Sequence, residues 1–385
     1  MNLFNINMFI FKIKYSRFRK NLLFIDRSVP QFDKDAGSRS AYHWLKLFIN
    51  LGFNVIFLGD DFLDKEPYTS ILNSFGIEIL SGNYFLNNWK QWLNDNGQNL
   101  DYVILNRPVI AEKYIDLIKN CTNAKIFYFG QDLHYLRIER EASLANNEDY
   151  LLESKRLKEI EYKIMKKSDY VYYFSTKEVE IIKSFDPIIN CKTIPLYMFS
   201  KSKILKFDNN RKNLLFVGNF DHSPNSDGFR WLNNFILPYI IKNHPEIIIY
   251  VIGSNIPDDI KKFENNSVKI LGHIDDKTLF EFYKNCRICV VPLRFGAGLK
   301  GKILEAMYNQ IPIITTSIGA EGLPAENSFL VVEDDHEKFT GKILDMYYNN
   351  NYLKNITKNN YRYVMKHFSF NKAIEIIKSD FFNYD

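Results

Sequence analysis

The sequence predicts two α/β domains in tandem, each a parallel, doubly wound sheet with helices on both faces. The 385 residues exceed the roughly 250–300 at which a single hydrophobic core usually stops growing. Short apolar runs alternate with helical segments, which is typical of parallel sheets covered by helices. This alternation occurs twice, and a polar stretch at about 200–213 separates the two series. Two such domains are expected to face each other across a cleft.

The first series contains seven predicted strands: Leu22–Ile25, Asn54–Leu58, Ile77–Leu80, Tyr102–Leu105, Lys125–Phe129, Tyr170–Phe174 and Lys192–Ile194. The segment between the first two strands has apolar residues spaced as on the core-facing side of a helix: Ala41, Trp44, Leu45, Phe48 and Ile49. Gly52 follows as a natural C-terminal cap.

The second series contains six predicted strands: Leu214–Val217, Ile247–Ile252, Val268–Leu271, Ile288–Val291, Ile311–Thr315 and Phe329–Val332. Residues after about 335 are predicted to be helical. We therefore expect four parts: a basic and aromatic segment (1–20), a first domain (21–205), a second domain (206–365) and a C-terminal helix (366–385) that packs back on the first domain. Ligands of such sheets bind beyond the carboxyl ends of the strands, so the loops there are expected to carry the chemistry.

The net charge lies at the N-terminus. The chain has 50 basic and 45 acidic residues, and residues 1–20 hold five basic and no acidic ones: Lys12, Lys14, Arg17, Arg19 and Lys20. The remaining body is neutral, which argues against nucleic-acid binding. Interleaved basic and aromatic residues favour peripheral contact with an anionic membrane; a first strand or a frayed end is the alternative. No apolar run approaches the roughly 18–20 residues of a membrane span, so a cytoplasmic protein at the inner membrane face is expected.

The cysteines do not predict a metal or redox site. Cys286 and Cys289 form a C-x-x-C pair, but no second pair or nearby histidine completes a zinc ligand set. Cys289 lies in an apolar run, which favours a core position. Nothing indicates a disulfide framework, so a reducing compartment fits.

The loop after the strand Ile288–Val291 is the strongest candidate site. It contains three glycines, whose backbone N–H groups are unshielded, and a helix begins at about Gly301. Cationic side chains and one carboxylate accompany the glycines, and the residues concerned are Arg294, Gly296, Gly298, Lys300, Lys302 and Glu305. Amides, a helix N-terminus and cations together predict a diphosphate site, and Glu305 is placed to accept hydrogen bonds from ribose hydroxyls. A glycine-rich loop with solvated lysines is the alternative.

Two further loops of the second series are expected at the same sheet edge. The first follows Leu214–Val217 and offers Gly218, Asn219, His222 and Asn225 before a helix. The second runs from Ser317 to Gly322 and offers Gly319 and Glu321. Their glycines allow the backbone to approach a phosphate or a sugar closely.

In the first series, the residues Gly37, Ser38 and Arg39 follow the first strand and are candidates for contact with phosphate or acceptor. Asp33-Lys34-Asp35 has the D-x-D shape of a metal-dependent sugar transferase. This three-residue match arises often by chance, and we give it no metal role. The loop after Lys125–Phe129 carries Gln131, Asp132 and His134.

The second half resembles the donor domain of the GT-B retaining glycosyltransferases called glycosyltransferase family 4. The resemblance rests on Phe216–Phe220, Val251–Gly253, Val268–Gly272 and the run Gly298–Gly322. The first half is similar to the family's more variable acceptor domain. The resemblance implies a nucleotide-diphosphate sugar as donor, retention of anomeric configuration, no metal or other cofactor, and a glycan or lipid-linked glycan as acceptor. It also implies donor binding by Gly253 and a catalytic residue near the donor sugar, for which His134 is the candidate and Gln131 or Asp132 the alternatives.

The sequence departs from the family pattern in two places. The family motif is Glu, seven residues, Glu; Glu305 matches its second position, but Ala297 stands at the first. Glu321 is a candidate substitute. The basic residues that the family has after the first glycine are replaced by Asn219 and, a few residues later, Asn225, so we expect Lys300, Lys302 and Arg294 to supply the charge.

Two other functions remain open: a non-hydrolysing nucleotide-sugar epimerase on a similar frame, and a catalytically silent subunit that binds sugar nucleotides or glycans, which Ala297 makes credible. A dehydrogenase is disfavoured because no G-x-G-x-x-G opens a helix after an early strand.

Overall fold

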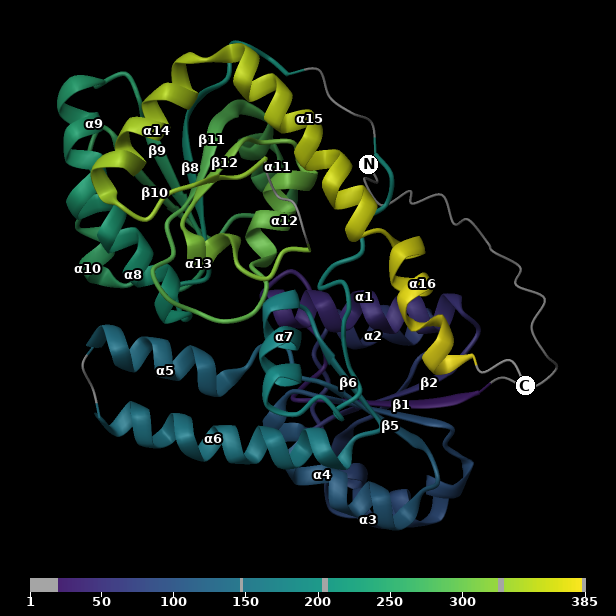
Figure 1. Ribbon diagram of the computed structural model, residues 1–385. Helices are drawn as coiled ribbons and strands as arrows, with labels where there is room; N and C mark the ends of the chain where they lie inside the picture. Colours follow the sequence, from purple (N-terminus) through teal and green to yellow (C-terminus); the bar gives the residue numbers. More distant parts are fainter. Residues whose placement is uncertain (1–19, 146–147, 203–206, 325–328, 383–385) are drawn as a thin grey trace. The chain divides into compact units, whose positions relative to one another are not determined.

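The computed structural model describes residues 20–145, 148–202, 207–324 and 329–382 (Figure 1). The predicted N-terminal segment therefore lies outside the described residues, except for Lys20. The chain divides into two compact units. Unit 1 comprises Met1–Tyr135, Leu151–Ile194 and Ala373–Asp385, and unit 2 comprises Leu136–Tyr150 and Pro195–Lys372. Residues 136–150 thus group with the second unit, although they lie within the first strand series.

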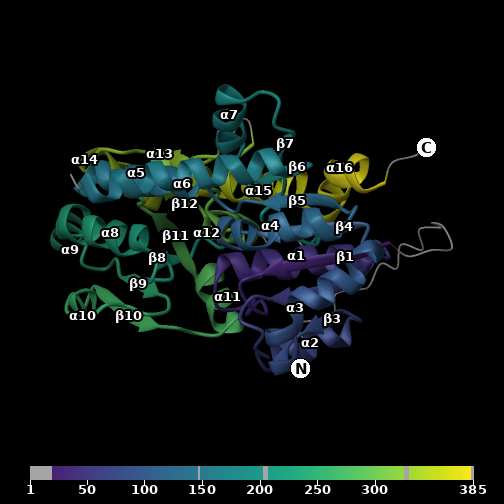
Figure 2. The same cartoon turned by 90° about the horizontal axis from the view of Figure 1, so that it is seen from below.

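Unit 1 contains, within its described residues, a seven-stranded sheet in the order β3-β2-β1-β4-β5-β6-β7 with parallel pairing throughout. In Figure 2 the labels of β3, β1, β4, β5, β6 and β7 follow this order across the sheet. The strands are β1 (Asn21–Asp26), β2 (Asn54–Gly59), β3 (Glu78–Leu80), β4 (Tyr102–Asn106), β5 (Lys125–Phe129), β6 (Tyr170–Tyr173) and β7 (Cys191–Thr193).

The helices of this unit lie on both sides of its sheet, with α1 and α2 on one side and α3 and α4 on the other (Figure 1). Their bounds are α1 (Ala36–Asn50), α2 (Tyr68–Ser74), α3 (Gly82–Asn96), the short 3-10 helix η1 (Gly97–Asn99), α4 (Pro108–Cys121), α6 (Glu148–Lys167) and α7 (Thr176–Phe185). Helix α5 (His134–Ala145) begins in unit 1, but its residues from Leu136 onward belong to unit 2. The predicted stripe of α1 is buried, except that Ile49 at its edge is half-buried.

Helix α16 (Phe370–Phe381) ends in unit 1. The ring of Phe381 lies against aromatic rings from α1 and the sheet, at 5.2 Å from Phe48, 5.1 Å from Tyr102 and 4.1 Å from Phe127 between ring centroids. Tyr102 also donates a hydrogen bond to the Phe381 carbonyl at 2.7 Å. The apolar face of the last helix is therefore part of the core of unit 1.

Unit 2 has its own parallel sheet, six-stranded among the described residues, in the order β10-β9-β8-β11-β12-β13. Its strands are β8 (Lys212–Val217), β9 (Ile249–Ile252), β10 (Val268–Gly272), β11 (Cys286–Val291), β12 (Ile313–Thr315) and β13 (Val331–Val332). Its further helices are α8 (Ser223–Trp231), the π-helix η2 (Leu232–Ile236), α9 (Leu237–Asn243), α10 (Asp258–Lys261), α11 (Asp276–Asn285), α12 (Gly301–Tyr308), α13 (Ser317–Ala320), α14 (His336–Tyr348) and α15 (Asn350–His367).

Figure 1 shows α8, α9 and α14 on one side of the second sheet and α11 and α12 on the other. A core of apolar residues from both layers, including Phe216, Phe229 and Phe339, lies beneath α8 and α14. The predicted fold class, two doubly wound α/β sheets, is thus confirmed. In each sheet the strand order reverses beside its first strand, between β1 and β4 and between β8 and β11, which is where ligands bind in this architecture.

Among the described residues, no helix has the length and the apolar character that a membrane span needs. Cys191, Cys286 and Cys289 are buried, and burial raises the pKa of each of these thiols to about 12, so they remain protonated at neutral pH.

Candidate active site

The predicted donor loops of unit 2 meet at the carboxyl ends of β8, β9 and β11. A Cβ atom added to Gly253 would lie 1.7 Å from the carbonyl oxygen of Gly218, so the loops after β8 and β9 are in close contact. A Cβ atom on Gly218 would lie 3.0 Å from the Lys302 Nζ, which belongs to the loop and helix after β11. Three segments that are distant in the sequence are therefore brought together at Gly218.

Lys302 directs its ammonium group into this junction. Its Nζ donates a hydrogen bond to Asn225 Oδ1 and lies 5.6 Å from the centre of the Phe216 ring. The pKa of Lys302 is lowered to about 8, chiefly by desolvation; the neighbouring Lys300 charge also lowers it, while Cys289 and Glu305 act in the opposite direction. An anion bound beside this ammonium would offset the cost of burying its charge.

Lys300 also turns inward. The residue is 9% exposed, and its Nζ donates hydrogen bonds to the carbonyl oxygens of Ala297, at 3.2 Å, and Gly298, at 2.5 Å. The loop can wrap around this ammonium because Gly296 and Gly298 adopt φ angles of 137° and 71°, which other residues rarely adopt. Neither predicted lysine therefore points into bulk water, as the alternative of a solvated loop would require.

Helix α12 begins directly after Lys300, and Gly301 is its first residue. A Cβ atom on Gly301 would lie 2.5 Å from the hydroxyl oxygen of Tyr197, so the start of the helix packs tightly against this ring. Glu305 follows Lys302 by three residues on the same helix and is half-buried. Its charge reaches the Lys302 ammonium, as the effect on the pKa of Lys302 shows.

Other predicted donor residues have protein partners. Arg294 forms a bidentate ion pair with Asp227 of α8, with Nε 2.9 Å from Oδ2. The Asn219 carbonyl accepts a hydrogen bond from Asn225 Nδ2 at 2.6 Å, and His222 occupies the position before α8. A Cβ atom on Gly319 would lie 1.9 Å from Thr315 Oγ1, so close packing accounts for this glycine. Donor contacts by these residues remain predictions.

Glu321, the candidate substitute for the missing carboxylate, pairs with an arginine that sequence reasoning did not single out. Arg140 donates from Nη1 and Nη2 to the two Glu321 carboxylate oxygens at 2.7 and 2.8 Å. The same Nη1 lies 2.6 Å from the carbonyl oxygen of Gly296, next to Ala297. No spacing in the sequence connects Arg140 with the residues around 296 or 321.

In unit 1, the predicted catalytic pair is formed. His134 Nε2 lies 3.1 Å from Asp132 Oδ1, and both side chains are about one-fifth exposed. The pair sits at the carboxyl end of β5, where His134 begins helix α5. A histidine held by a carboxylate is suited to donating hydrogen bonds to a ligand or to exchanging a proton with it.

Two fully buried carboxylates accept hydrogen bonds from the backbone of this loop. Glu161 of α6 accepts hydrogen bonds from the backbone N–H groups of His134 and Tyr135, each at 3.1 Å, and Glu178 of α7 accepts one from Leu133 at 2.7 Å. Burial raises the pKa of Glu161 to about 7, and the His134 charge partly opposes this rise. Sequence reasoning missed both residues; Glu161 could have been found because it shares the buried face of α6 with Ile164 and Met165.

A second network that the sequence analysis missed connects the ends of β1, β4 and β5. Gln131 donates to Asn106 Oδ1, Asn106 donates to Asp26 Oδ2 at 2.7 Å, and Arg107 Nε donates to Asp26 Oδ1 at 2.8 Å. Gln131 and Arg107 have positive φ angles of 66° and 84°. Such backbone strain in non-glycine residues is characteristic of functional sites.

The residues predicted to contact phosphate or acceptor lie beside this network. A Cβ atom on Gly37 would lie 2.5 Å from an Nη atom of Arg107, so the start of α1 and the guanidinium are in contact. Ser38 bonds Asp35, the N-cap of α1, and Arg39 Nε donates to the Phe32 carbonyl at 3.0 Å. Asp33 accepts from Tyr68. Both aspartates of the D-x-D match thus have structural partners.

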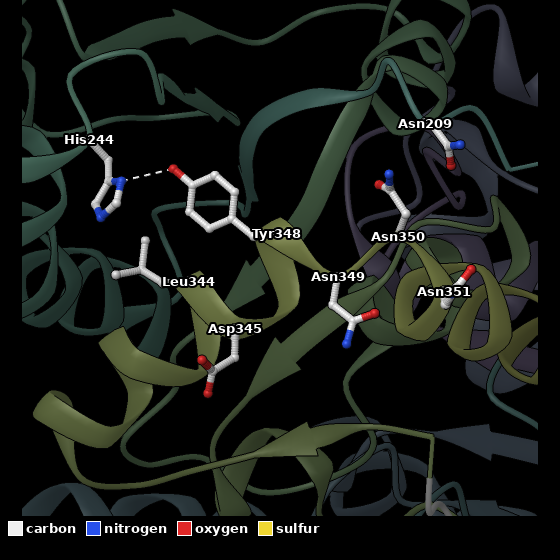
Figure 3. A pocket seen from close by; sticks show the side chains of 8 residues that line it. All are labelled: Asn209, His244, Leu344, Asp345, Tyr348, Asn349, Asn350 and Asn351. Atoms are coloured by element: carbon white, nitrogen blue, oxygen red, sulfur yellow. Dashed lines mark hydrogen bonds between the residues drawn. The ribbon is translucent and has the colours of Figure 1, made fainter.

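A hollow elsewhere in unit 2 has a different character (Figure 3). It is lined by Asn209, His244, Leu344, Asp345, Tyr348 and Asn349–Asn351. His244 and Asn209 precede β9 and β8, so the hollow lies near the amino ends of the strands, away from Gly218. His244 Nδ1 lies 2.8 Å from the Tyr348 hydroxyl, Asn349 caps α15, and Asn350 accepts from Arg287. Much of this polar lining therefore serves the fold.

Comparison with known proteins supports the sequence resemblance. Residues 211–349 match the family described as glycosyl transferases group 1. An uncharacterized 44.6 kDa protein in the cps region of Klebsiella pneumoniae is 30% identical over 180 residues. This alignment covers 45% of the chain and 46% of the relative, so the chain matches about half the length of that protein.

Solved structures extend the likeness to nearly the whole chain. HepE from Anabaena in complex with UDP and glucose has a TM-score of 0.64 at 14% identity, covering 93% of this chain and 98% of that one. A glycosyltransferase from Rickettsia africae has a TM-score of 0.66 at 15% identity, covering 94% and 98%. At such identities the likeness shows the fold. The expected resemblance to GT-B glycosyltransferases is confirmed.

Proposed function

We propose that this chain, whose residues 211–349 belong to the glycosyl transferases group 1, transfers a sugar from a nucleotide-diphosphate sugar to a glycan or lipid-linked glycan acceptor. Transfer with retention of anomeric configuration and without a metal is part of the proposal. The relative in a cps region favours a place in polysaccharide biosynthesis. The structure of HepE was solved with UDP and glucose, which favours a nucleotide-sugar donor here.

The observation that carries the proposal is the pair of inward-turned lysines. Lys300 turns its ammonium group toward the backbone carbonyls of Ala297 and Gly298, and Lys302 turns its own toward Asn225. Desolvation chiefly lowers the pKa of Lys302, and repulsion from the Lys300 charge adds to this effect. A diphosphate at the Gly218 junction would relieve both the repulsion and the desolvation.

The reaction would proceed by front-side displacement. As the bond between the anomeric carbon and the diphosphate oxygen breaks, its electron pair stays on the phosphate, and the sugar acquires oxocarbenium character. Lys300, Lys302 and the loop amides would stabilise the growing phosphate charge, which is the kind of interaction that usually contributes most to catalysis. The acceptor hydroxyl then attacks the same face, and the leaving phosphate takes its proton. A catalytic role for Asp132 and His134 of unit 1, which the family resemblance implies, is part of the proposal.

Two substitutions test the role of the lysines. Lys300→Ala and Lys302→Ala should each lower turnover by about 10²–10³-fold, because each removes a charge that stabilises the transition state. Lys342→Ala is the matched control, since Lys342 is a partly exposed lysine of the same unit that pairs with Glu333. Acceptor-dependent release of nucleotide is the measurement. Unchanged turnover in both site variants would refute the diphosphate assignment.

A binding screen followed by the nucleotide-release assay separates the alternative functions. A thermal-shift screen with UDP-, GDP-, ADP- and dTDP-sugars first identifies the donor, because a ligand at 100 times its Kd adds about 2.7 kcal/mol to stability. An epimerase would convert the donor without any acceptor. A silent binding subunit would be stabilised by the donor but release no nucleotide. If the lysines take the place of a metal, turnover should be unchanged in EDTA. A loss of turnover in EDTA that Mg²⁺ or Mn²⁺ restores would contradict the proposed metal independence.

A further inference from the structure

Arg140 connects two loops of unit 2 that are otherwise separate. It donates three charge-assisted hydrogen bonds, one to the Gly296 carbonyl and two to the Glu321 carboxylate, at 2.6–2.8 Å. The first partner begins the loop that encloses Lys300, and the second follows α13 at the end of β12. Arg140 is on α5, in the segment Leu136–Tyr150 that belongs to unit 2.

The environment of this pair distinguishes it from surface ion pairs of the unit. The side chains of Arg140 and Glu321 are 23% and 15% exposed, whereas those of Arg230 and Asp259 are 41% and 54% exposed. Partial burial reduces screening by water and leaves a large penalty if either charge loses its partner. A planar guanidinium with two parallel bonds to one carboxylate also fixes the direction of both groups.

Each bond has a consequence for the anion site. Gly296 adopts a φ of 137°, which glycine tolerates, and Arg140 supplies a donor for its carbonyl at the start of the loop. Glu321 carries a negative charge that would weaken binding of a diphosphate nearby. Arg140 neutralises this charge. Removal of Arg140 would therefore loosen the loop and release an unpaired carboxylate beside it.

We propose that Arg140 is a positioning residue for donor binding, which holds the loop at Gly296 and neutralises Glu321 so that a nucleoside diphosphate can occupy the site of Lys300 and Lys302. This inference rests on the proposed function and deepens it. It adds to the donor site a helix residue that lies more than 150 positions earlier in the sequence. Arg140 acts through Gly296 and Glu321 and makes no direct contact with the donor.

A double-mutant cycle tests the proposal. Isothermal titration of the full chain with UDP, GDP and ADP identifies the nucleotide that binds the wild type. Arg140→Met should then weaken its affinity at least tenfold, because Glu321 is left unpaired. The double variant Arg140→Met/Glu321→Gln should recover part of that loss, since the uncompensated charge is gone. Arg140→Lys should lie between Arg140→Met and the wild type, and Arg230→Met should bind as the wild type does.

The outcomes separate the two levels of inference. If the wild type binds none of the three nucleotides, the proposed function fails and the role of Arg140 fails with it. If the wild type binds and Arg140→Met binds within twofold of it, the role of Arg140 alone is wrong. If Arg140→Met lowers the melting temperature but not the affinity of the folded protein, Arg140 is a structural residue only. If the variant does not fold, Arg140→Lys against Arg140→Lys/Glu321→Gln provides the same comparison.

Discussion

Lys302 is a residue of the donor loops whose charge state depends on pH within an accessible range. Its pKa is lowered to about 8 by burial, and a bound diphosphate would stabilise the protonated form and raise this pKa. Affinity for the nucleoside diphosphate should therefore be full below about pH 8 and decrease as the pH rises through it, because the free protein then loses the proton that the complex requires.

Titrations of the full chain at several pH values between about 6.5 and 9.5 measure this dependence. Lys302→Arg is the control, because a guanidinium stays protonated over this range, so its affinity should be independent of pH even if it is weaker. A wild-type affinity that is constant through pH 8 would mean that Lys302 does not face the phosphates.

At the same scale, the donor loop could be predicted because its chemistry is contiguous. Gly296, Gly298, Lys300 and Lys302 fall within seven residues, so their spacing alone indicates an anion site. The network of Asp26, Asn106 and Arg107 is different, because Asp26 is 80 positions from Asn106 and meets it only when β1 pairs with β4. No pattern in a single sequence predicts that these side chains meet.

At the scale of elements, α6 determines where α5 begins. The Glu161 carboxylate accepts hydrogen bonds from the backbone N–H groups of His134 and Tyr135, which open a helix and so need an acceptor outside its regular bonding pattern. The Glu161 carboxylate is fully buried, so its ionised form is costly. Burial raises its pKa from 4.5 to about 7. Sequence reasoning predicted that chemistry would follow β5 but could not predict what supports it.

This support predicts a pH-dependent stability. The folded chain keeps the Glu161 proton up to about pH 7, whereas the unfolded chain releases it above its ordinary pKa of 4.5. The stabilising contribution of this group is therefore full below 4.5 and lost as the pH rises through about 7. Glu161→Gln cannot ionise, so the wild type should lose stability relative to Glu161→Gln as the pH rises over this range.

Urea unfolding of both proteins between about pH 4.5 and pH 8 provides the measurement, with the difference in unfolding free energy as the readout. Glu153→Gln is the matched control, because Glu153 is exposed on the same helix and Arg156 lowers its pKa. If the wild-type and Glu161→Gln curves run parallel over the whole range, Glu161 does not hold a proton in the folded chain.

The strands show how much of the secondary structure the pattern of apolar runs predicts. All thirteen predicted strands have a counterpart among the described residues, but several are shorter, such as β12, which begins at Ile313 rather than Ile311. Pro312 accounts for this difference, since proline lacks the N–H that the ladder needs. The sequence analysis predicted the strands but not their order in the sheets, and the return of residues 136–150 to unit 2 had no signal in composition.

At the scale of the molecule, the charge distribution separates the folded body from its N-terminal segment. Lys20, which precedes β1, forms an ion pair with Asp101, which precedes β4. The other four basic residues of this segment, Lys12, Lys14, Arg17 and Arg19, lie outside the described residues. Each basic residue near an anionic lipid surface contributes about 1 kcal/mol, so four give about 4 kcal/mol, and the interleaved aromatic residues add to this. We propose that this segment attaches the enzyme peripherally to an anionic membrane, where a lipid-linked acceptor would be found.

Sedimentation with vesicles measures this attachment. The full chain should sediment with vesicles that contain phosphatidylglycerol, and less so with purely zwitterionic vesicles or at high salt, because salt screens the attraction. A variant with Lys12, Lys14, Arg17 and Arg19 changed to Gln should lose most of this binding but retain its affinity for the nucleotide, since the donor residues lie in unit 2. Equal sedimentation of the variant and the wild type would assign any membrane contact to the folded body, whose neutral charge gives no reason to expect it.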